Sequence, residues 1–403
     1  MKTNHVILYT DKKLATTYRA SGPVPENLSF KLKPNTLQGS SKINIAIEEM
    51  DSGKTSDLYN RNSDVIAIAP IMPLKLIQPI NKPLKVTDSK IKDELWNIEA
   101  VAASKSEFNG AGIRIAILDT GIDSKHIAFK GMKLHEKDFT GEGNGDIEGH
   151  GTHCAGVAFG RDIKGRRIGI ANASDDALIA KVLGVNGGGS DILVNAINWA
   201  VNSGANIISM SLGIDFPGYA AQLEMDGMHK EAAISSALDG YRKNILLFES
   251  LANLVRVQSQ NKFTQPVIII AASGNESSRP QYRINVSPPA VSEGIISVGA
   301  VGKEKSNLYV APFSNMDPTL CAPGVDIISA EANTNGLISL DGTSMATPHV
   351  AGIAALWAEK LLKKNQFNAN TLYSNITVAC KDDKLKKEDA DDYGVGIVQA
   401  PFR

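Results

Sequence analysis

Four polar residues of this sequence are of types that could do chemistry together: Asp119, His150, Asn275 and Ser344. Asp119 directly follows the run IRIAIL, and Asn275 lies just beyond another such run, VIIIAAS. His150 lies in the small-residue segment GHGTHCAG, and Ser344 shortly precedes the apolar segment IAALWAEKLL. A carboxylate, an imidazole, a hydroxyl and an amide are the groups with which a protein activates a hydroxyl nucleophile and stabilises the oxyanion that its attack creates.

Three of these residues also have simpler interpretations. Asp119 begins the sequence Asp-Thr-Gly, which could form a turn or belong to an aspartic protease, for which the segment DSG at Asp51 would supply a second copy. That copy follows a polar stretch, and too little chain separates the two for the two lobes of such an enzyme. Ser344 could cap its helix, and Asn275 could be an ordinary loop residue.

The two histidines of GHGTHCAG raise the possibility of a metal site. His150 and His153 would lie on one face of a helix, but a third ligand at a usable spacing is missing, and so is the glutamate of the H-E-x-x-H zinc motif. A histidine packed among small core residues describes His153 better than His150. We therefore assign no metal site.

The chain order of the candidate residues separates the classes of serine hydrolase. Asp, then His, then a Ser that opens a long helix differs from the chymotrypsin order and from the Ser, Asp, His order of the α/β-hydrolases. The G-x-S-x-G elbow of the α/β-hydrolases is also not met, because Ala346 occupies its last place. A helix N-terminus at Ser344 would favour negative charge that develops nearby.

Six motifs in register resemble those of the subtilisin-like serine proteases: AILDTGID, GHGTHCAG, MSLG, AASGNE, CAPGVDIIS and GTSMATPHVAG. The resemblance covers about residues 96–403 and implies a serine endopeptidase that works through an acyl-enzyme. It implies that Ser344 is the nucleophile, that His150 is the general base and that Asp119 orients the imidazole. Asn275 and the backbone N–H of Ser344 would form the oxyanion hole.

The resemblance also implies where a substrate would bind. One strand would pair with the substrate backbone, and a second segment would form the other wall of the first specificity pocket; the residues are Ser211, Leu212 and Gly213 for the strand and Ala272, Ser273 and Gly274 for the wall. Main-chain pairing supplies affinity and pockets supply specificity. The small residues of these walls favour a large apolar substrate side chain in the first pocket, while Glu276 at the pocket leaves a basic side chain possible there.

The elements that must position these residues form an α/β domain. Its apolar runs are continuous rather than alternating, which is typical of parallel strands buried on both faces. Residues 190–204 have a helical pattern that ends in Gly. We expect a doubly wound, mostly parallel sheet flanked by helices over residues 96–403, with strands at 113–118, 177–183, 206–213, 267–273 and 295–301.

A smaller α+β unit is expected before this domain. Residues 1–80 contain short apolar runs at 6–10, 42–50 and 65–77, and they resemble, more weakly, the inhibitory propeptide of the same family. Residues 81–95 continue a Pro- and Lys-rich stretch typical of an exposed, cleavable linker. The resemblance implies a zymogen whose own N-terminal domain is an intramolecular inhibitor; a permanently attached accessory domain is the alternative.

A longer interval than is usual in the family separates Gly213 from Asn275. The additional residues, about 214–262, have helical periodicity. We predict a helical insertion, either on the surface or beside the substrate cleft, where it would restrict access.

Composition excludes some partners and limits others. The 42 Lys and Arg residues balance 43 Asp and Glu residues, so nothing indicates a nucleic-acid partner. The three cysteines are too few for a disulfide framework. No apolar stretch has the length of a membrane span, and the start of the sequence lacks the apolar region of a secretory signal, so a cytoplasmic location is the expectation unless an export segment precedes this sequence.

The expected partner is a peptide or protein substrate, and no cofactor is expected. Calcium is possible by family resemblance, but the basic segment FGRDIKGRRIGIANA lacks the oxygen ligands that this ion needs, and no calcium site is assigned. Two alternatives stay open: a peptide-processing or transpeptidating relative in which an amine resolves the acyl-enzyme, and a catalytically silent binding module.

Overall fold

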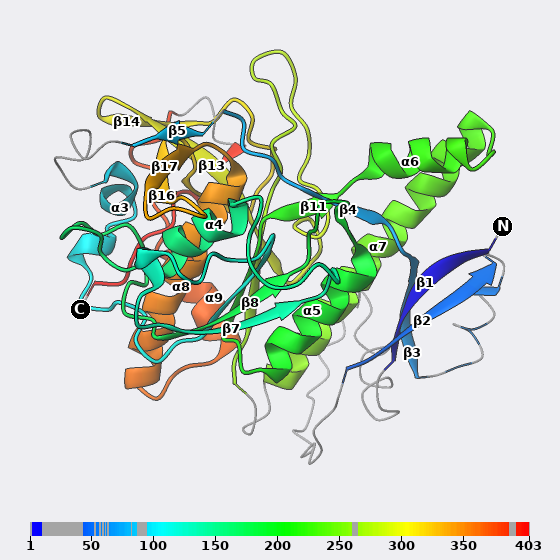
Figure 1. Cartoon of the computed structure of the whole chain (residues 1–403), viewed down its shortest axis with the longest axis horizontal. Coiled ribbons are helices and arrows are strands. Elements are labelled where there is room, and N and C mark those ends of the chain that lie inside the picture. The colour runs from blue at the N-terminus through cyan, green and yellow to red at the C-terminus, as the bar shows by residue number, and fades with distance from the viewer. Residues whose placement is uncertain are drawn as a thin grey trace, which may run out of the picture.

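A seven-membered path of strands forms the centre of the molecule (Figure 1). The structure is a computed structural model that describes residues 2–9, 43–51, 54–55, 58, 60, 62, 64–81, 83–86, 95–259, 265–386 and 392–402. The strand order is β14-β13-β12-β10-β6-β8-β7, and β15 also pairs with β13. Every pairing in this sheet is parallel except that of β13 with β14. The expected doubly wound, mostly parallel sheet is confirmed.

Five strands of this sheet, β6, β8, β10, β12 and β13, lie close to the predicted apolar runs, whereas the other three were not predicted. The bounds are β6 (Ile115–Asp119), β7 (Lys133–Asp138), β8 (Asp176–Lys181), β10 (Ile207–Met210), β12 (Ile268–Ala272), β13 (Ile295–Glu304), β14 (Asn307–Val310) and β15 (Leu320–Pro323). All residues of β6, β10 and β12 are buried. Burial on both faces explains why these strands show no alternation of polar and apolar residues.

Helices cover both faces of the sheet. The helices α4 (His150–Phe159) and α8 (Thr343–Lys363) pack on one face together with Ile115 and Ile117, whereas α5 (Ser190–Asn202) and α7 (Lys230–Ser259) pack on the other. Alternate residues of one strand therefore belong to different cores. Other helices of the larger domain, among the residues that the structure describes, are α3 (Trp96–Ala100), α6 (Phe216–Met225), α9 (Ala369–Val378) and the short 3-10 helices at Ala103–Lys105 and Ile127–Phe129.

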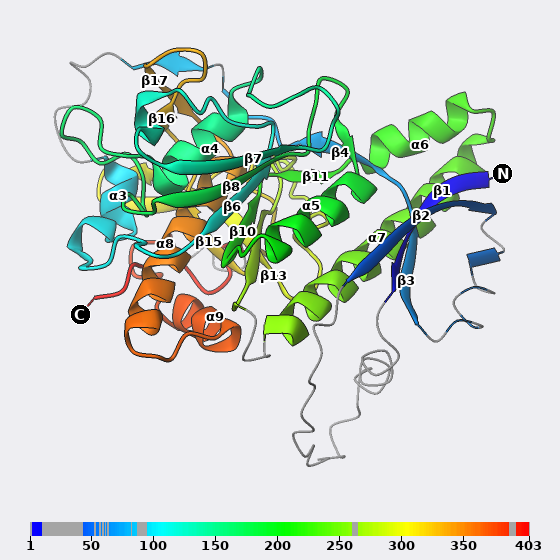
Figure 2. The ribbon, with the colours of Figure 1, turned by 60° about the horizontal axis from the view of Figure 1, so that its bottom comes forward.

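A small antiparallel sheet precedes this domain and lies against α5 and α7 (Figure 2). It has the order β2-β1-β3, with bounds β1 (Lys2–Tyr9), β2 (Asn44–Asp51) and β3 (Val65–Pro70). The side chains of Val6 and Leu8 belong to the same apolar cluster as Leu247 and Phe248 of α7. Part of the N-terminal unit is thus packed onto the larger domain.

The apolar run at residues 65–77 forms two strands rather than one. The first, β3, ends at Pro70, and β4 (Pro73–Leu76) joins a different sheet, between β9 (Gly188–Gly189) and β11 (Leu212–Ile214). Further along, β5 (Leu84–Lys85) pairs with β17 (Leu337–Leu340), which pairs with β16 (Ile327–Ala330). The chain after the small sheet therefore crosses the face of the larger domain (Figure 1).

The long interval after Gly213 contains two helices. Helix α6 begins directly after β11, and α7 runs back from it to contact β3 of the small sheet. The Asn244 amide of α7 donates to the carbonyl of Pro70 at 2.9 Å. Within the described part of the chain, no helix is both long and apolar enough to cross a bilayer.

Candidate active site

Asp119 and His150 form a buried hydrogen-bonded pair. Asp119 is the last residue of β6, and His150 is the first residue of α4. The Nδ1 atom of His150 lies 2.7 Å from Oδ1 of Asp119, and their side chains are 2% and 1% exposed. The backbone N–H of Thr120 donates to the same Oδ1 at 2.8 Å. The two residues are thus delivered to one point by a strand end, which the sequence predicted for Asp119, and by a helix start.

The two histidines of α4 have opposite electrostatic surroundings. Burial acts to lower the pKa of His150, but the Asp119 carboxylate and the Cys154 sulfur outweigh it and raise this pKa well above its ordinary value. Burial, together with the charge of His150, lowers the pKa of His153 to about 3. His153 contacts the carbonyl of Ile327 instead. His153 therefore belongs to the core, and His150 faces the site.

Asp146 holds the turn after β6 against the start of α4. This buried carboxylate accepts hydrogen bonds from the hydroxyl of Thr120 at 2.8 Å and from the backbone N–H groups of Gly149 and Thr152, both at 2.8 Å. It thereby fixes the two segments that carry Asp119 and His150. The sequence analysis did not single out Asp146; its place four residues before His150 was the available signal.

Ser344 lies in the first turn of α8, near the helix N-terminus that the sequence predicted. Its hydroxyl donates to the backbone carbonyl of Ile77 at 2.9 Å. Among the described residues, Nε2 of His150 has no hydrogen-bond partner. The serine hydroxyl is thus bonded to the segment that follows β4 rather than to the imidazole.

Asn275 lies beyond the end of β12 with its amide turned toward the same segment. Its Oδ1 accepts hydrogen bonds from the backbone N–H and the hydroxyl of Thr343, and its Nδ2 donates to the carbonyl of Gln78 at 2.9 Å. Asn315, which the sequence analysis missed, braces this loop by accepting from the N–H groups of Glu276 and Ser277, both at 3.1 Å. The donor face of Asn275 is therefore fixed by its neighbours.

The strand β4 lies in the cleft as a third strand between two walls. It pairs antiparallel with β11, with Lys75 opposite Gly213, and with β9, with Leu74 opposite Gly188. The side chain of Ile77 is 2% exposed, and a Cβ on Gly213 would stand 3.9 Å from its Cγ1. Ile77 is therefore within van der Waals reach of the position that a side chain at residue 213 would take.

The predicted substrate-binding residues divide into two groups. Leu212 and Gly213 lie in β11 and pair with β4, while the Ser211 hydroxyl donates to the carbonyl of Ser344 at 3.2 Å. The other group, Ala272, Ser273 and Gly274, ends β12 and leads to Asn275; the Gly274 N–H donates to the Thr343 hydroxyl at 3.3 Å. Both groups lie around the segment that contains Ile77.

Cys154 is a buried neighbour of the pair rather than a nucleophile. Its Sγ lies 3.8 Å from Nδ1 of His150 and 3.3 Å from the carbonyl of Ser344. Burial raises the pKa of this thiol, which disfavours the reactive thiolate. Asp119, His150 and Cys154 are also the one group of possible metal ligands in the described residues, and the hydrogen bond between Asp119 and His150 already occupies two of them.

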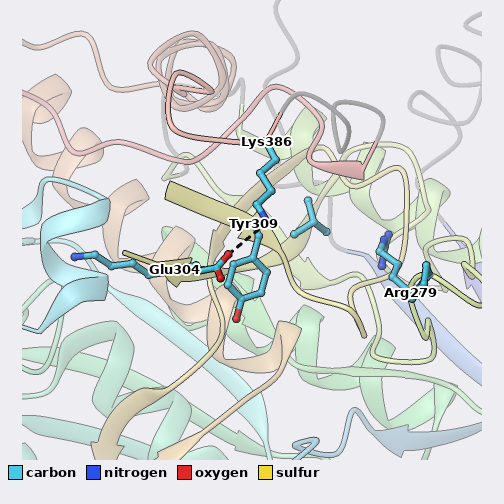
Figure 3. Close-up of a pocket in the computed structure, with 7 residues that line it drawn as sticks. Arg279, Glu304, Tyr309 and Lys386 are labelled. Atoms are coloured by element: carbon cyan, nitrogen blue, oxygen red, sulfur yellow. Dashed lines mark hydrogen bonds and ion pairs between the residues drawn. The ribbon is translucent and has the colours of Figure 1, made fainter. Parts of the chain in front are cut away.

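An open pocket of about 470 Å³ lies elsewhere and shares no residue with this site (Figure 3). Its charged side chains have partners: Lys386 pairs with Glu304 at 3.4 Å, Lys303 with Glu99 at 3.3 Å, and Arg279 with Asp392 at 3.0 Å. This pocket offers no unpaired charge for a ligand, and the chemistry lies in the cleft.

The strand-end carboxylate of Asp119 is thus paired with the helix-start imidazole of His150, and Ser344 lies in the first turn of another helix. Residues 110–396 match the Subtilase family, Peptidase_S8. The chain is 34% identical over 259 residues to the major intracellular serine protease of Bacillus subtilis (strain 168), and the match covers 61% of this chain and 68% of that protein. It belongs to the subtilase family and is a serine endopeptidase.

Two further proteins are similar to this chain. An intracellular serine protease of Paenibacillus polymyxa is 29% identical over 300 residues, which cover 72% of this chain and 77% of that protein. The crystal structure of fervidolysin from Fervidobacterium pennivorans, a keratinolytic enzyme related to subtilisin, has a TM-score of 0.63 and 20% sequence identity, and the match covers 99% of this chain and 60% of that chain. This second likeness concerns the fold.

Proposed function

We propose that Ser344 cuts peptide bonds with the help of His150, Asp119 and Asn275, and that the N-terminal part of the same chain blocks this site in a zymogen. The observation that carries the proposal is that the Ser344 hydroxyl and the Asn275 amide each lie 2.9 Å from a carbonyl of one extended segment. Acyl transfer requires a nucleophile and an oxyanion donor beside the bound chain, and both face this one segment.

The reaction follows from the chemistry of these groups. As Oγ of Ser344 attacks a peptide carbonyl carbon, Nε2 of His150 takes the hydroxyl proton, and Asp119 stabilises the resulting imidazolium. The oxyanion accepts hydrogen bonds from the Asn275 amide and the Ser344 backbone N–H. When the C–N bond breaks, the leaving amine receives the proton from His150, and water then hydrolyses the acyl-enzyme through the same residues.

Inhibition by the N-terminal part is supported by the path of its chain. Residues of β4 take the place that a substrate strand would take beside β11. Beyond the catalytic residues the segment stays attached, because the Ile80 N–H donates to the carbonyl of Asp341 at 3.0 Å and the Asn81 amide contacts the Asp341 carboxylate. A peptide substrate and this segment compete for one cleft.

The geometry at the centre explains how the segment can stay uncut. Ser344 is bonded to the carbonyl of Ile77, whereas Asn275 is bonded to the next carbonyl, that of Gln78. Attack requires the nucleophile and the oxyanion donor to act on the same carbonyl group. The segment is thus bound one carbonyl out of register with the catalytic groups.

We also propose that the protease works inside the cell. Two relatives are named as intracellular serine proteases, and Cys154, Cys321 and Cys380 are free thiols, as a reducing compartment would leave them. Fractionation of the source cells against a cytosolic marker protein tests this; recovery with secreted proteins would contradict it.

The decisive experiment compares the wild-type chain with Ser344→Ala. The wild type is expected to hydrolyse peptides, to react with a fluorophosphonate probe and to convert itself slowly to a chain cut within residues 78–95, while the variant does none of these. For subtilisin itself, loss of the serine lowers turnover by about a factor of 10⁶. Equal labelling of the two chains would show that Ser344 is not the reactive nucleophile. No labelling and no hydrolysis by either chain, even after the N-terminal part has been cut off, would show a silent binding module; identical full-length masses would argue against self-processing.

A further inference from the structure

One side chain of the bound segment makes two ion pairs with the walls of the cleft. Nζ of Lys75 lies 3.4 Å from Oε1 of Glu276 and 3.8 Å from Oδ1 of Asp215. The two carboxylates come from separate segments: Asp215 directly follows β11, and Glu276 follows Asn275. The lysine is therefore paired with negative charge from two parts of the larger domain.

The register of β4 gives this lysine a defined position along the cleft. Lys75 is paired with Gly213 and stands two residues before Ile77, whose carbonyl is held by Ser344. On the proposed function, on which this inference rests, a substrate in the same ladder would place its third residue before the cut bond where Lys75 lies. Antiparallel pairing fixes this spacing whatever the side chain is.

Both carboxylates are held in place by other contacts. Asp215 caps α6 by accepting from the Gly218 N–H at 3.3 Å, and its own N–H donates to the carbonyl of Pro73 at 2.9 Å. The other oxygen of Glu276, Oε2, accepts from the Asn315 amide at 2.8 Å, which leaves Oε1 for the lysine. Groups positioned in advance lose less conformational entropy when a cation binds.

The helical insertion contributes to the same place. Asp215 is the N-cap of α6, the first helix of the insertion. The ring of Phe216 packs against that of Tyr241 on α7 with centroids 5.7 Å apart. Tyr241 lies near enough to Glu276 that the carboxylate adds to the effect of burial in raising the pKa of the phenol. The insertion therefore helps to form the wall of the cleft at this position.

We propose that Asp215 and Glu276 form a specificity subsite that selects Lys or Arg at the third residue before the cut bond. The side chains involved stay partly exposed, at 39% for Lys75, 31% for Asp215 and 36% for Glu276. Exposed ion pairs are individually weak, so two of them predict a preference of about three- to tenfold for Lys over Gln. Salt screens such pairs, and the preference falls as ionic strength rises.

The test is a competition between peptides in one reaction with the full chain. The peptides carry Met-Pro-Leu-Xaa-Leu-Ile-Gln, the sequence of residues 72–78, with Xaa as Lys, Arg, Gln or Glu, followed by Ala-Ala. Mass spectrometry measures the relative disappearance of each and locates the cut. The ratio of two kcat/KM values obtained in this way does not depend on what fraction of the enzyme is inhibited.

Two substitutions remove the charge and keep the shape. Asp215→Asn retains a good helix cap, and Glu276→Gln retains an oxygen for Asn315. The double variant is expected to cleave the Lys and Gln peptides equally, as the wild type should in 1 M salt. Asp226→Asn, at the opposite end of α6, is the matched control and should keep the wild-type ratio.

The outcomes separate this inference from the function beneath it. A preference for Lys and Arg that disappears in the double variant supports the subsite. Ser344-dependent cleavage with equal rates for all four peptides, or a preference that persists in the double variant, overturns the subsite and leaves the protease assignment intact. If no peptide is cut in a Ser344-dependent way, the proposed function fails and the subsite with it.

Discussion

The two parts of the cleft hold the same segment in different ways. On the side of β4 the segment is a regular strand, in register with β11 and with β9, and Leu74 is 3% exposed between them. At the centre the regularity ends, because Ser344 and Asn275 contact successive carbonyls. The difference teaches that the strand walls can supply affinity without supplying catalysis, since rate depends on alignment at one carbonyl.

The offset at the centre of the cleft can be tested by shortening the bound segment. Deletion of Pro79 removes one residue between the carbonyl held by Ser344 and Ile80, whose N–H is held by Asp341. We expect the Ile77 carbonyl to reach both catalytic groups and the chain to cut itself about 10²-fold faster, because misplacement by about 1 Å has an effect of that size. Intact-mass time courses measure the rate.

Two controls make the deletion informative. Pro79→Gly removes the ring but keeps the length, and it should leave self-cleavage slow. The deletion combined with Ser344→Ala should stay uncut, which would exclude a contaminating protease. If the deleted chain were as stable to self-cleavage as the wild type, the offset between the two carbonyls would not be what protects the segment.

The contribution of the strand side to holding the segment can be tested by a substitution in β4. Leu74→Asp would place a carboxylate in a buried position between β9 and β11, and burying a charge without a partner is costly. The segment should leave the cleft more often, and hydrolysis of an added peptide by the full chain should rise by about tenfold or more. Initial rates, measured before any self-cleavage, test this expectation.

The matched control uses another leucine of the same stretch. Leu84 is 58% exposed, so Leu84→Asp adds the same charge without burying it and should leave the rate close to that of the wild type. Equal rates for Leu74→Asp and the wild type would show that β4 contributes little to inhibition.

Much of this arrangement was predictable because it depends on local pattern. The apolar runs that became β6, β10 and β12 are buried along their whole length, and a fully buried strand needs no other signal. The order of Asp119, His150 and Ser344 likewise identified the family before any distance was known. Residues at strand ends and helix starts are where such a fold concentrates its chemistry.

The parts that could not be predicted depend on contacts between distant segments. Asp146 and Asn315 act through hydrogen bonds to other loops. Apart from the place of Asp146 four residues before His150, nothing in their immediate sequence distinguishes them from ordinary loop residues. The break between β3 and β4 follows from where each half finds a partner strand. An apolar run predicts a strand but not which sheet it joins.

The contrast between the centre and its surroundings extends to the stability of the protein, where the expected effect is smallest. Burial lowers the pKa of His153 to about 3 and that of His349 to about 4, whereas Asp119 and Cys154, acting against burial, raise the pKa of His150. Below pH 6.5 the unfolded chain protonates His153 and His349 while the folded chain does not. Folding should therefore weaken from pH 6.5 toward pH 4, by about 1.4 kcal/mol per pH unit for each of the two.

The contribution of His150 to folding stability depends on pH in the opposite direction. Because the pKa of His150 is raised in the folded protein, this contribution is complete below pH 6.5 and is lost as the pH rises through the folded pKa. Unfolding by denaturant at pH 5.0, 5.5 and 6.0 isolates the acid limb. His349 bonds to the carbonyl of Met345 and to the Asn97 amide, and His349→Gln should lower the overall stability yet reduce the slope of this limb by about one proton. A slope unchanged by that substitution would mean that His349 is protonated in the folded protein, and the contrast between a raised pKa at His150 and lowered pKa values in the core would not hold.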